Sequence, residues 1–331
     1  MTNPRFDVLC IGNAIVDVIA DTTDAFLSNQ GLHKGSMRLI DEAEAVRLYD
    51  AMGSGREISG GSAGNTAAGL AAFGISSAFI GQVADDQLGQ IFRHDIEAQG
   101  IAFLVEPRSG VGATARSLIL VTPDAQRTMN TFLGAAQRLN KGSVDLAAVA
   151  DSAIVYLEGY LWDPAEPRAA MEAAIEAAHA AGRKVAFTLS DTFCVERHRD
   201  SFWQLLRDGK IDILFANEAE AASMAQVNDV EEALPQLATH VQTLVVTRSE
   251  NGATAMSGGE RADVPAEPIR ELVDTTGAGD LFAAGYLAGE ARGLGLKASL
   301  RLGAIAAAEV IQHYGARPEA DLKVLAEGVL A

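Results

Sequence analysis

Alternation of strand-like and helix-like segments is the feature that most constrains the fold of this chain. Residues 78–83 form an apolar run typical of a buried strand, residues 88–99 have helical spacing, and residues 101–105 form another strand-like run. The alternation returns later, with strand-like runs at residues 153–157, 184–188, 211–215 and 241–246 and helical patterns at residues 166–181 and 202–207. Segments in this order predict βαβ units and a mostly parallel sheet covered by helices.

The alternation is interrupted in the first half of the chain. Residues 113–121 and 127–133 predict a hairpin with no helix between its strands. We expect a small β-sheet whose strands come from about 14–40 and 101–133 and which projects from a single continuous domain, 1–331. A small sheet above an active site would act as a lid that excludes water.

The composition limits which molecules and surfaces this chain can bind. A net charge of −18 would repel nucleic acid and anionic membrane surfaces, so a small anionic ligand needs a local binding site. The two cysteines, Cys10 and Cys194, provide no disulfide framework and no metal-ligand spacing, which predicts a reducing cytoplasm. We find no membrane-spanning apolar run and no signal-peptide pattern, and therefore expect neither membrane anchoring nor secretion.

The segment 274–289, DTTGAGDLFAAGYLAG, predicts a glycine-rich turn followed by a buried helix. Gly277, Ala278 and Gly279 would lie where free amides and the positive end of the helix dipole converge, which makes the turn a candidate anion hole. Asp280 could take a proton from an attacking hydroxyl while these amides hold the charge on a phosphoryl group. The alternative is that Asp280 only stabilises the first turn of its helix.

A second glycine-rich turn precedes a small-residue helix at residues 67–73. The pair Gly60 and Gly61 beside Asn65 suggests backbone contact with a polar ligand. The segment lacks the ending of a Walker A loop, and no dinucleotide-binding GxGxxG motif follows a strand. Earlier in the chain, Asp17 interrupts an apolar run, so it either faces solvent or accepts hydrogen bonds from ligand hydroxyls.

Asn217 and Glu220 follow the strand-like run at residues 211–215. In a helix, residues three apart lie on the same side, here at the end of a strand where open α/β sheets bind ligands. A carboxylate and an amide suit Mg²⁺ with its waters. The alternative is a solvated helix start that is rich in acidic residues.

The motifs GGSAGNT, NEAE and DTTGAGD occur in the order and approximate spacing of the ribokinase-like family of carbohydrate and nucleoside kinases, also called the PfkB family. The resemblance extends over nearly the whole chain. It implies a three-layer α/β/α sandwich with a mostly parallel central sheet and a small β-sheet lid. It also implies ATP and Mg²⁺ as cofactors, K⁺ as a candidate further ion, a nucleoside or sugar substrate, and a monomer or lid-mediated homodimer.

The resemblance implies roles for single residues as well. Asp280 would be the catalytic base, with Gly277, Ala278 and Gly279 as the anion hole, and Arg127 resembles an arginine that faces the phosphate. Residues that would hold the acceptor are Asp17, Gly60, Gly61 and Asn65. Those around ATP would be Asn217, Thr247, Ser249 and Gly252, with Glu220 binding Mg²⁺ through water. A monovalent cation would be held by Asp274 and Thr276, with the loop around Gly315.

Within the family the chain looks most like adenosine kinases, because IDILFANEAEA, TLSDTFCVERH and VYLEGYLWD resemble segments of those enzymes. One of two paired aromatics in the acceptor pocket of adenosine kinases is Leu161 here, whereas Tyr160 still offers a ring for stacking. The main hypothesis is phosphorylation of the 5′-hydroxyl of a nucleoside, adenosine to AMP. The alternatives are a kinase for a ribose- or fructose-like sugar and a non-catalytic nucleotide-binding regulator. Asp280 argues against the regulator, since a carboxylate would repel bound phosphates.

Overall fold

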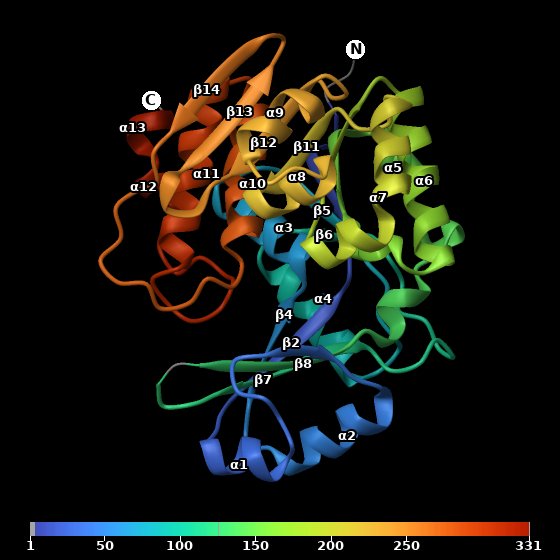
Figure 1. The fold of residues 1–331 in the computed structure, drawn as a ribbon. Helices are drawn as coiled ribbons and strands as arrows, with labels where there is room; N and C mark the ends of the chain where they lie inside the picture. The colour runs from blue at the N-terminus through green and yellow to red at the C-terminus, as the bar shows by residue number, and fades with distance from the viewer. Residues whose placement is uncertain (1–3, 125, 331) are drawn as a thin grey trace.

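The computed structural model describes residues 4–124 and 126–330 of the predicted domain 1–331 and arranges them around two sheets of unequal size (Figure 1). Within these residues the large sheet has nine strands in the order β14-β13-β12-β11-β10-β9-β1-β5-β6. In chain order they are β1 (Phe6–Ile11), β5 (Ser77–Ile80), β6 (Ala102–Phe103), β9 (Ser152–Glu158), β10 (Lys184–Thr188), β11 (Ile213–Asn217), β12 (Thr243–Thr247), β13 (Ala253–Ser257) and β14 (Glu260–Val264). Neighbours from β6 to β12 pair in parallel, and β13 and β14 pair antiparallel.

Helices cover both faces of the large sheet (Figure 1). One face carries α3 (Ser62–Ala72), α10 (Ala278–Ala291) and α11 (Leu296–Val310). The other carries α5 (Leu146–Ala150), α6 (Ala165–Ala180), α7 (Thr192–Arg207), α8 (Glu218–Ala225) and α9 (Val230–Ala238). Helix α4 (Gln87–Ala98) packs against β6 and against a strand of the small sheet, β4 (Arg56–Gly60). The short elements are α12 (Leu322–Leu325), α13 (Glu327–Leu330), η1 (Gly134–Arg138), η2 (Lys141–Ser143), η3 (Gly159–Trp162) and η4 (Ser249–Asn251). None of the described helices is long and apolar enough to cross a membrane.

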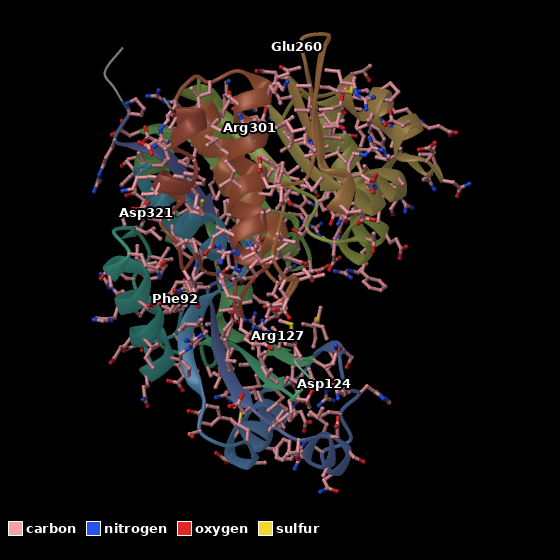
Figure 2. The ribbon with its side chains drawn as sticks, turned by 90° about the vertical axis from the view of Figure 1, so that its left-hand side faces the viewer. Phe92, Asp124, Arg127, Glu260, Arg301 and Asp321 are labelled. Atoms are coloured by element: carbon pink, nitrogen blue, oxygen red, sulfur yellow. The ribbon has the colours of Figure 1, made fainter. Side chains whose placement is uncertain are left out.

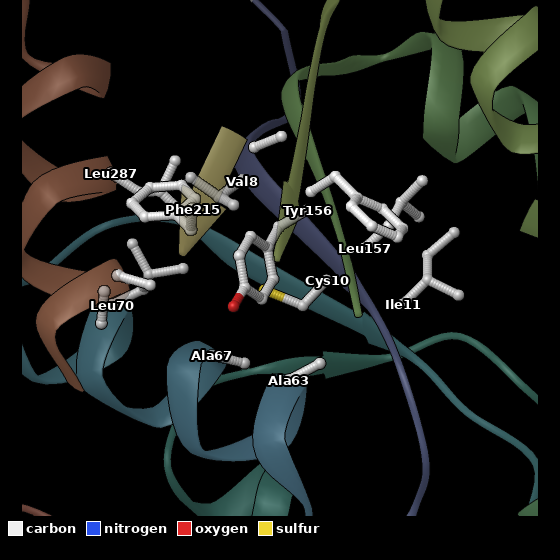
Figure 3. Packing of buried hydrophobic residues seen from close by; sticks show 14 of the residues in the cluster. Val8, Cys10, Ile11, Ala63, Ala67, Leu70, Tyr156, Leu157, Phe215 and Leu287 are labelled. Atoms are coloured by element: carbon white, nitrogen blue, oxygen red, sulfur yellow. The ribbon is translucent and has the colours of Figure 1, made fainter. Parts of the chain in front are cut away.

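The core explains why the strand-like runs are apolar throughout. Because helices cover both faces, side chains on both sides of each central strand are buried. Figure 3 shows Cys10 of β1 and Tyr156 of β9 packed between strands and the helices α3 and α10. At Gly69 these two helices approach so closely that a Cβ would lie 2.6 Å from the Cβ of Ala284. This contact packs α3 and α10 closely against each other.

The small sheet has the strand order β3-β8-β7-β2-β4 among the described residues. Its strands are β2 (Ile15–Asp21), β3 (Met37–Leu39), β4 (Arg56–Gly60), β7 (Ala115–Val121) and β8 (Arg127–Phe132). Helices α1 (Asp24–Asn29) and α2 (Glu42–Ala51) lie on the side away from the large sheet (Figure 1). The opposite side of the small sheet therefore faces the body of the protein.

The predicted α/β/α architecture with a small sheet is confirmed, and the hairpin β7–β8 joins β2 and β3 as expected. Two strands differ from the prediction. β6 pairs with β5 in the large sheet, so the second lid segment begins at β7 and not at residue 101. β4 pairs with β2 in the small sheet, although its short sequence REISG shows no clear strand pattern. Sheet membership depends on tertiary pairing, which strand-length patterns do not specify.

Candidate active site

The first turn of α10 offers free backbone amides. Its N-cap, Gly277, has a φ of 79° and no side chain caps the helix. A Cβ on Gly277 would lie 2.5 Å from that of Ala316, so glycine is required for both the conformation and the packing. The amides of Gly279 and Asp280 donate to none of the described residues. A Cβ on Gly279 would meet nothing within 4 Å, so the space in front of these amides is open.

The Asp280 carboxylate is held in one orientation by the first turn of α3. The Ser62 hydroxyl donates to Oδ1 at 2.6 Å, and the Asn65 amide donates to Oδ2 at 2.8 Å. Burial raises the pKa of Asp280, while these two hydrogen bonds and the charge of Arg317 act in the opposite direction. The result is an oriented carboxylate that is more basic than an exposed aspartate.

Asp17 lies on the small sheet and faces the body of the protein. A Cβ on Gly60 would overlap its carboxylate, so this glycine allows the close approach. Burial raises the pKa of Asp17 to about 6, against the lowering effect of Arg317 and Arg127. No described residue donates a hydrogen bond to the carboxylate, so its oxygens can accept from hydroxyls of a ligand. The ligand-facing interpretation of Asp17 therefore fits the structure better than the solvent-facing one.

Glu158 is a buried carboxylate that sequence reasoning missed. It accepts hydrogen bonds from the backbone amide of Asn13 at 2.7 Å, the side-chain amide of Asn13 at 2.6 Å and the backbone amide of Ala63 at 2.8 Å. Burial raises the pKa of Glu158 to about 7. The residue joins the ends of β1 and β9 to the start of α3. An acid at the end of an apolar run, next to Gly159, was the signal that could have identified it.

Arg127 connects the small sheet to the turn before α10. Its Nη1 lies 2.8 Å from Oδ2 of Asp274, and both side chains are less than 10% exposed. Figure 2 shows Arg127 between the small sheet and the body. Its Nε and Nη2 are buried and have no hydrogen-bond partner among the described residues. These donors suit an anion in the adjacent space.

The residues predicted to hold a monovalent cation form a hydrogen-bonded turn. Oδ1 of Asp274 accepts from the amide of Thr276 at 3.1 Å and from its hydroxyl at 2.8 Å, and Oδ2 accepts from the amide of Gly315 at 3.1 Å. Arg127 is also ion-paired with this carboxylate, so both of its oxygens are already engaged by groups of the protein. A cation here would be bound by backbone carbonyls, and its presence stays a prediction.

Asn217 and Glu220 form a capping box at the start of α8. The Asn217 side chain accepts from the Glu220 amide at 2.8 Å, and Glu220 accepts from the backbone and side-chain nitrogens of Asn217 at 3.0 and 2.6 Å. Glu220 is buried, which raises its pKa to about 7. The predicted pairing of these residues is present, but Glu220 is not a solvated residue of the helix start.

The carboxyl ends of the parallel strands gather the remaining candidates at one edge of the large sheet. Thr247 ends β12 directly opposite Asn217 of β11. Tyr160 follows β9, and its hydroxyl donates to the carbonyl of Ser190 at 3.1 Å. Among the described residues no group of three or more His, Cys, Asp or Glu side chains could hold a metal ion.

Gly252, in the loop after β12, is required by the local backbone conformation and packing. Gly252 has a φ of 86°, and a Cβ there would overlap the carbonyl oxygen of Val264. Ser249 also has a positive φ, of 48°. The packing of β13 and β14 accounts for Gly252 without a nucleotide, so the contact of both residues with ATP stays a prediction.

Known proteins share this architecture along nearly their whole length. A probable sugar kinase from Rhizobium etli CFN 42 is 49% identical, with 98% of this chain and 99% of that chain covered and a TM-score of 0.91. An adenosine kinase from Sinorhizobium meliloti is also 49% identical, with the same coverage and a TM-score of 0.90. The adenosine kinase of Saccharomyces cerevisiae is 26% identical over 336 residues, which cover 95% of this chain and 96% of that protein.

The sequence profile of the pfkB family carbohydrate kinases matches residues 5–322. This range includes both glycine-rich turns, the capping box and the Asp280 site described above. The chain therefore belongs to the pfkB family of carbohydrate kinases and is a phosphotransferase that uses an alcohol group as acceptor.

Proposed function

We propose that this protein is an ATP-dependent kinase that phosphorylates the 5′-hydroxyl of a nucleoside and converts adenosine to AMP. The two solved structures with 49% identity have different names, one a probable sugar kinase and the other an adenosine kinase. Their names therefore do not decide between the acceptors. The chemistry of the small sheet's inner face supports the nucleoside.

The strand register places polar and apolar side chains side by side on this inner face. Directly paired residues share a face, so Asp17, Ser117 and Thr131 form a polar patch. The hydroxyls of Ser117 and Thr131 are 2.9 Å apart. Next to Thr131 lies Leu39, followed by Met37, and these side chains are 63% and 57% exposed.

The polar patch beside exposed apolar side chains is the main support for a nucleoside as the acceptor. A polar patch suits the hydroxyls of a ribose, and adjoining exposed apolar side chains suit a flat base. A free sugar would leave Met37 and Leu39 in water. Across the site, Tyr160 and Phe193 follow β9 and β10, and Phe193 is 69% exposed. Together they provide apolar walls on the side of the body.

The reaction follows from the positions of the chain's own groups. Asp280, held by Ser62 and Asn65, accepts the proton of the attacking hydroxyl. The amides at the start of α10 and the free guanidinium donors of Arg127 stabilise the charge on the transferred group. The small sheet excludes water, which would compete as a nucleophile.

The capping box is compatible with Mg²⁺. Each carboxylate oxygen of Glu220 has a second lone pair beyond the hydrogen bond that it accepts from Asn217. These lone pairs can accept hydrogen bonds from waters of the ion, and Thr247 lies beside Asn217 for contact with ATP. When bound, ATP supplies the phosphoryl group and Mg²⁺ neutralises charge on its phosphates. The buried free thiols of Cys10 and Cys194 support a reducing cytoplasm as the location.

Glu220→Gln should raise the Mg²⁺ concentration needed for half-maximal rate more than it raises KM for the acceptor. The substitution removes the charge that attracts the hydrated ion. Glu218→Gln is the matched control, because it removes an acidic side chain from the same helix start. Glu218 is ion-paired with Arg248. If Mg²⁺ titrations of Glu220→Gln and the wild type superimpose, the box only caps α8.

Tyr160→Ala should lower kcat/KM for adenosine about tenfold or more and leave any activity on free ribose unchanged. Stacking on an aromatic ring contributes about 1–3 kcal/mol per base. Tyr160→Phe is the control, since it keeps the ring and removes the hydrogen bond to Ser190. Equal losses in both variants would indicate a role of the hydroxyl, and no loss in either would place the base elsewhere.

A sugar kinase remains the second candidate because the polar patch of Asp17, Ser117 and Thr131 would also bind a ribose- or fructose-like acceptor. A comparison of adenosine with free sugars separates the two functions. The rate of ADP release with each acceptor measures this preference directly.

A further inference from the structure

Arg317 bridges the two ends of the glycine-rich turn between β4 and α3. Its Nη1 donates to the carbonyl of Gly64 at 2.7 Å. Its Nη2 donates to the carbonyl of Ser59 at 2.6 Å and to the Ser59 hydroxyl at 2.9 Å. Between these two attachment points lie Gly60, Gly61, Ser62 and Ala63. One guanidinium thus holds both sides of the turn.

Further contacts extend from both sides of the Arg317 guanidinium. Ser59 donates from its amide at 2.8 Å and from its hydroxyl at 2.5 Å to Asp95 of α4. The residue before Arg317, Ala316, is the one against which Gly277 packs, and Gly315 donates to Asp274. Three consecutive residues, Gly315 to Arg317, therefore contact the turns before α10 and α3.

We propose that Arg317 is a positioning residue for phosphoryl transfer, which clamps the β4–α3 turn and thereby orients the Asp280 carboxylate through Ser62 and Asn65. The proposal rests on Asp280 being the catalytic base. Ser62 lies within the clamped turn, and Asn65 directly follows the clamped Gly64. Loss of the clamp frees both donors to shift, and a displacement of about 1 Å at a reacting group can lower a rate about a hundredfold.

The charge of Arg317 has a second effect on the site. It lowers the pKa of Asp280 and of Asp17, in each case against the raising effect of burial. Other groups coupled to Asp280 by charge or hydrogen bonding are Asp17 of β2, Ser62 and Asn65 of α3, Tyr156 and Glu158 of β9, and Tyr160 of η3. Arg317 is the cation that opposes burial at Asp280, so its removal raises the pKa of the base.

The test compares Arg317→Gln, Arg317→Lys and the control Arg292→Gln. Arg292 also donates to a backbone carbonyl of the α3 region, that of Phe73, but at the far end of the helix. Arg317→Gln should lower kcat about tenfold to a hundredfold, leave KM for ATP unchanged and move the acid limb of the pH profile of kcat to higher pH. Arg317→Lys should keep the acid limb near the wild-type position but have a lower kcat, because an ammonium cannot reproduce the hydrogen bonds of the two guanidinium nitrogens. Arg292→Gln should affect only thermal stability.

A double-mutant cycle separates this proposal from the proposed function. In an Asp280→Asn background, Arg317→Gln should cause little further loss of kcat, because both changes act on the same base. Full additivity, or a wild-type kcat and acid limb in Arg317→Gln, would overturn the positioning role. All variants are assayed with the best acceptor of the wild type, so a preference for sugars would refute the nucleoside assignment and leave this test intact.

Arg317→Gln can fail to fold, since it leaves buried carbonyls without a donor. Ser59→Ala then provides the second test. It removes the hydroxyl shared by Arg317 and Asp95 but leaves the carbonyl of Ser59 in place. A fall in kcat with an unchanged KM for ATP supports the clamp, and an unchanged kcat contradicts it.

Discussion

Asp280→Asn should lower kcat by about a hundred- to ten-thousand-fold, while the fold and ATP binding are retained. The asparagine has the shape of the aspartate, and its carbonyl can still accept the hydrogen bond from Ser62. It cannot accept a proton from the acceptor hydroxyl. In the wild type, burial raises the pKa of Asp280, so activity should fall with decreasing pH at a higher pH than for an ordinary aspartate.

The control for this variant is Asp229→Asn. Asp229 caps α9 by accepting a hydrogen bond from the amide of Glu231 at 2.9 Å. If Asp280 only stabilised its helix, both variants would show a small loss of stability and normal turnover. Single-turnover rates and thermal unfolding midpoints of the two variants distinguish these outcomes. Near-wild-type turnover of Asp280→Asn would remove the residue from the role of base.

Gly279→Ala should lower kcat/KM about a hundredfold or more and leave thermal stability equal or higher. The new methyl group meets no atom within 4 Å beyond the adjoining residues and backbone of its own helix, and alanine favours the helical conformation. Since the Cα–Cβ bond of a helical residue tilts toward the N-terminus, the methyl enters the open space in front of the first turn. It would occupy the position of the phosphoryl group and keep it from the amides, each of which contributes about a hundred- to thousandfold at such sites.

Gly328→Ala is the matched control, because Gly328 lies in α13 and a Cβ there also meets nothing within 4 Å. We expect this variant to have unchanged kinetics. An increase in stability together with a loss of activity is the signature of a binding site at Gly279. Equal activity of Gly279→Ala and the wild type would contradict the anion hole.

The sequence predicted the fold where the physical cause is local. Buried parallel strands require continuous apolar runs, so residues 153–157 and 184–188 indicated β9 and β10 directly. β4 was missed because its pairing with β2, rather than its composition, makes it a strand. β6 lies within the strand-like run at residues 101–105, but its pairing with β5 places it in the large sheet and outside the expected range of the lid.

The candidate site was predictable only in part. The glycine turns indicated Asp280 and Asn65 separately, but their contact joins residues 215 positions apart. Arg127 and Asp274 were predicted in different roles, and the structure pairs them. Arg317 lies outside every motif and acts through backbone carbonyls, which the sequence does not reveal.

ADP release by the wild type with a panel of nucleosides and free sugars tests whether the acceptor is a nucleoside. Asp280→Asn, prepared in the same way, measures the background from contaminating kinases. The exposed apolar side chains Met37, Leu39 and Phe193 predict the highest kcat/KM for adenosine and much lower values for ribose and fructose. A preference for ribose or fructose over every nucleoside in the panel would contradict the assignment as a nucleoside kinase.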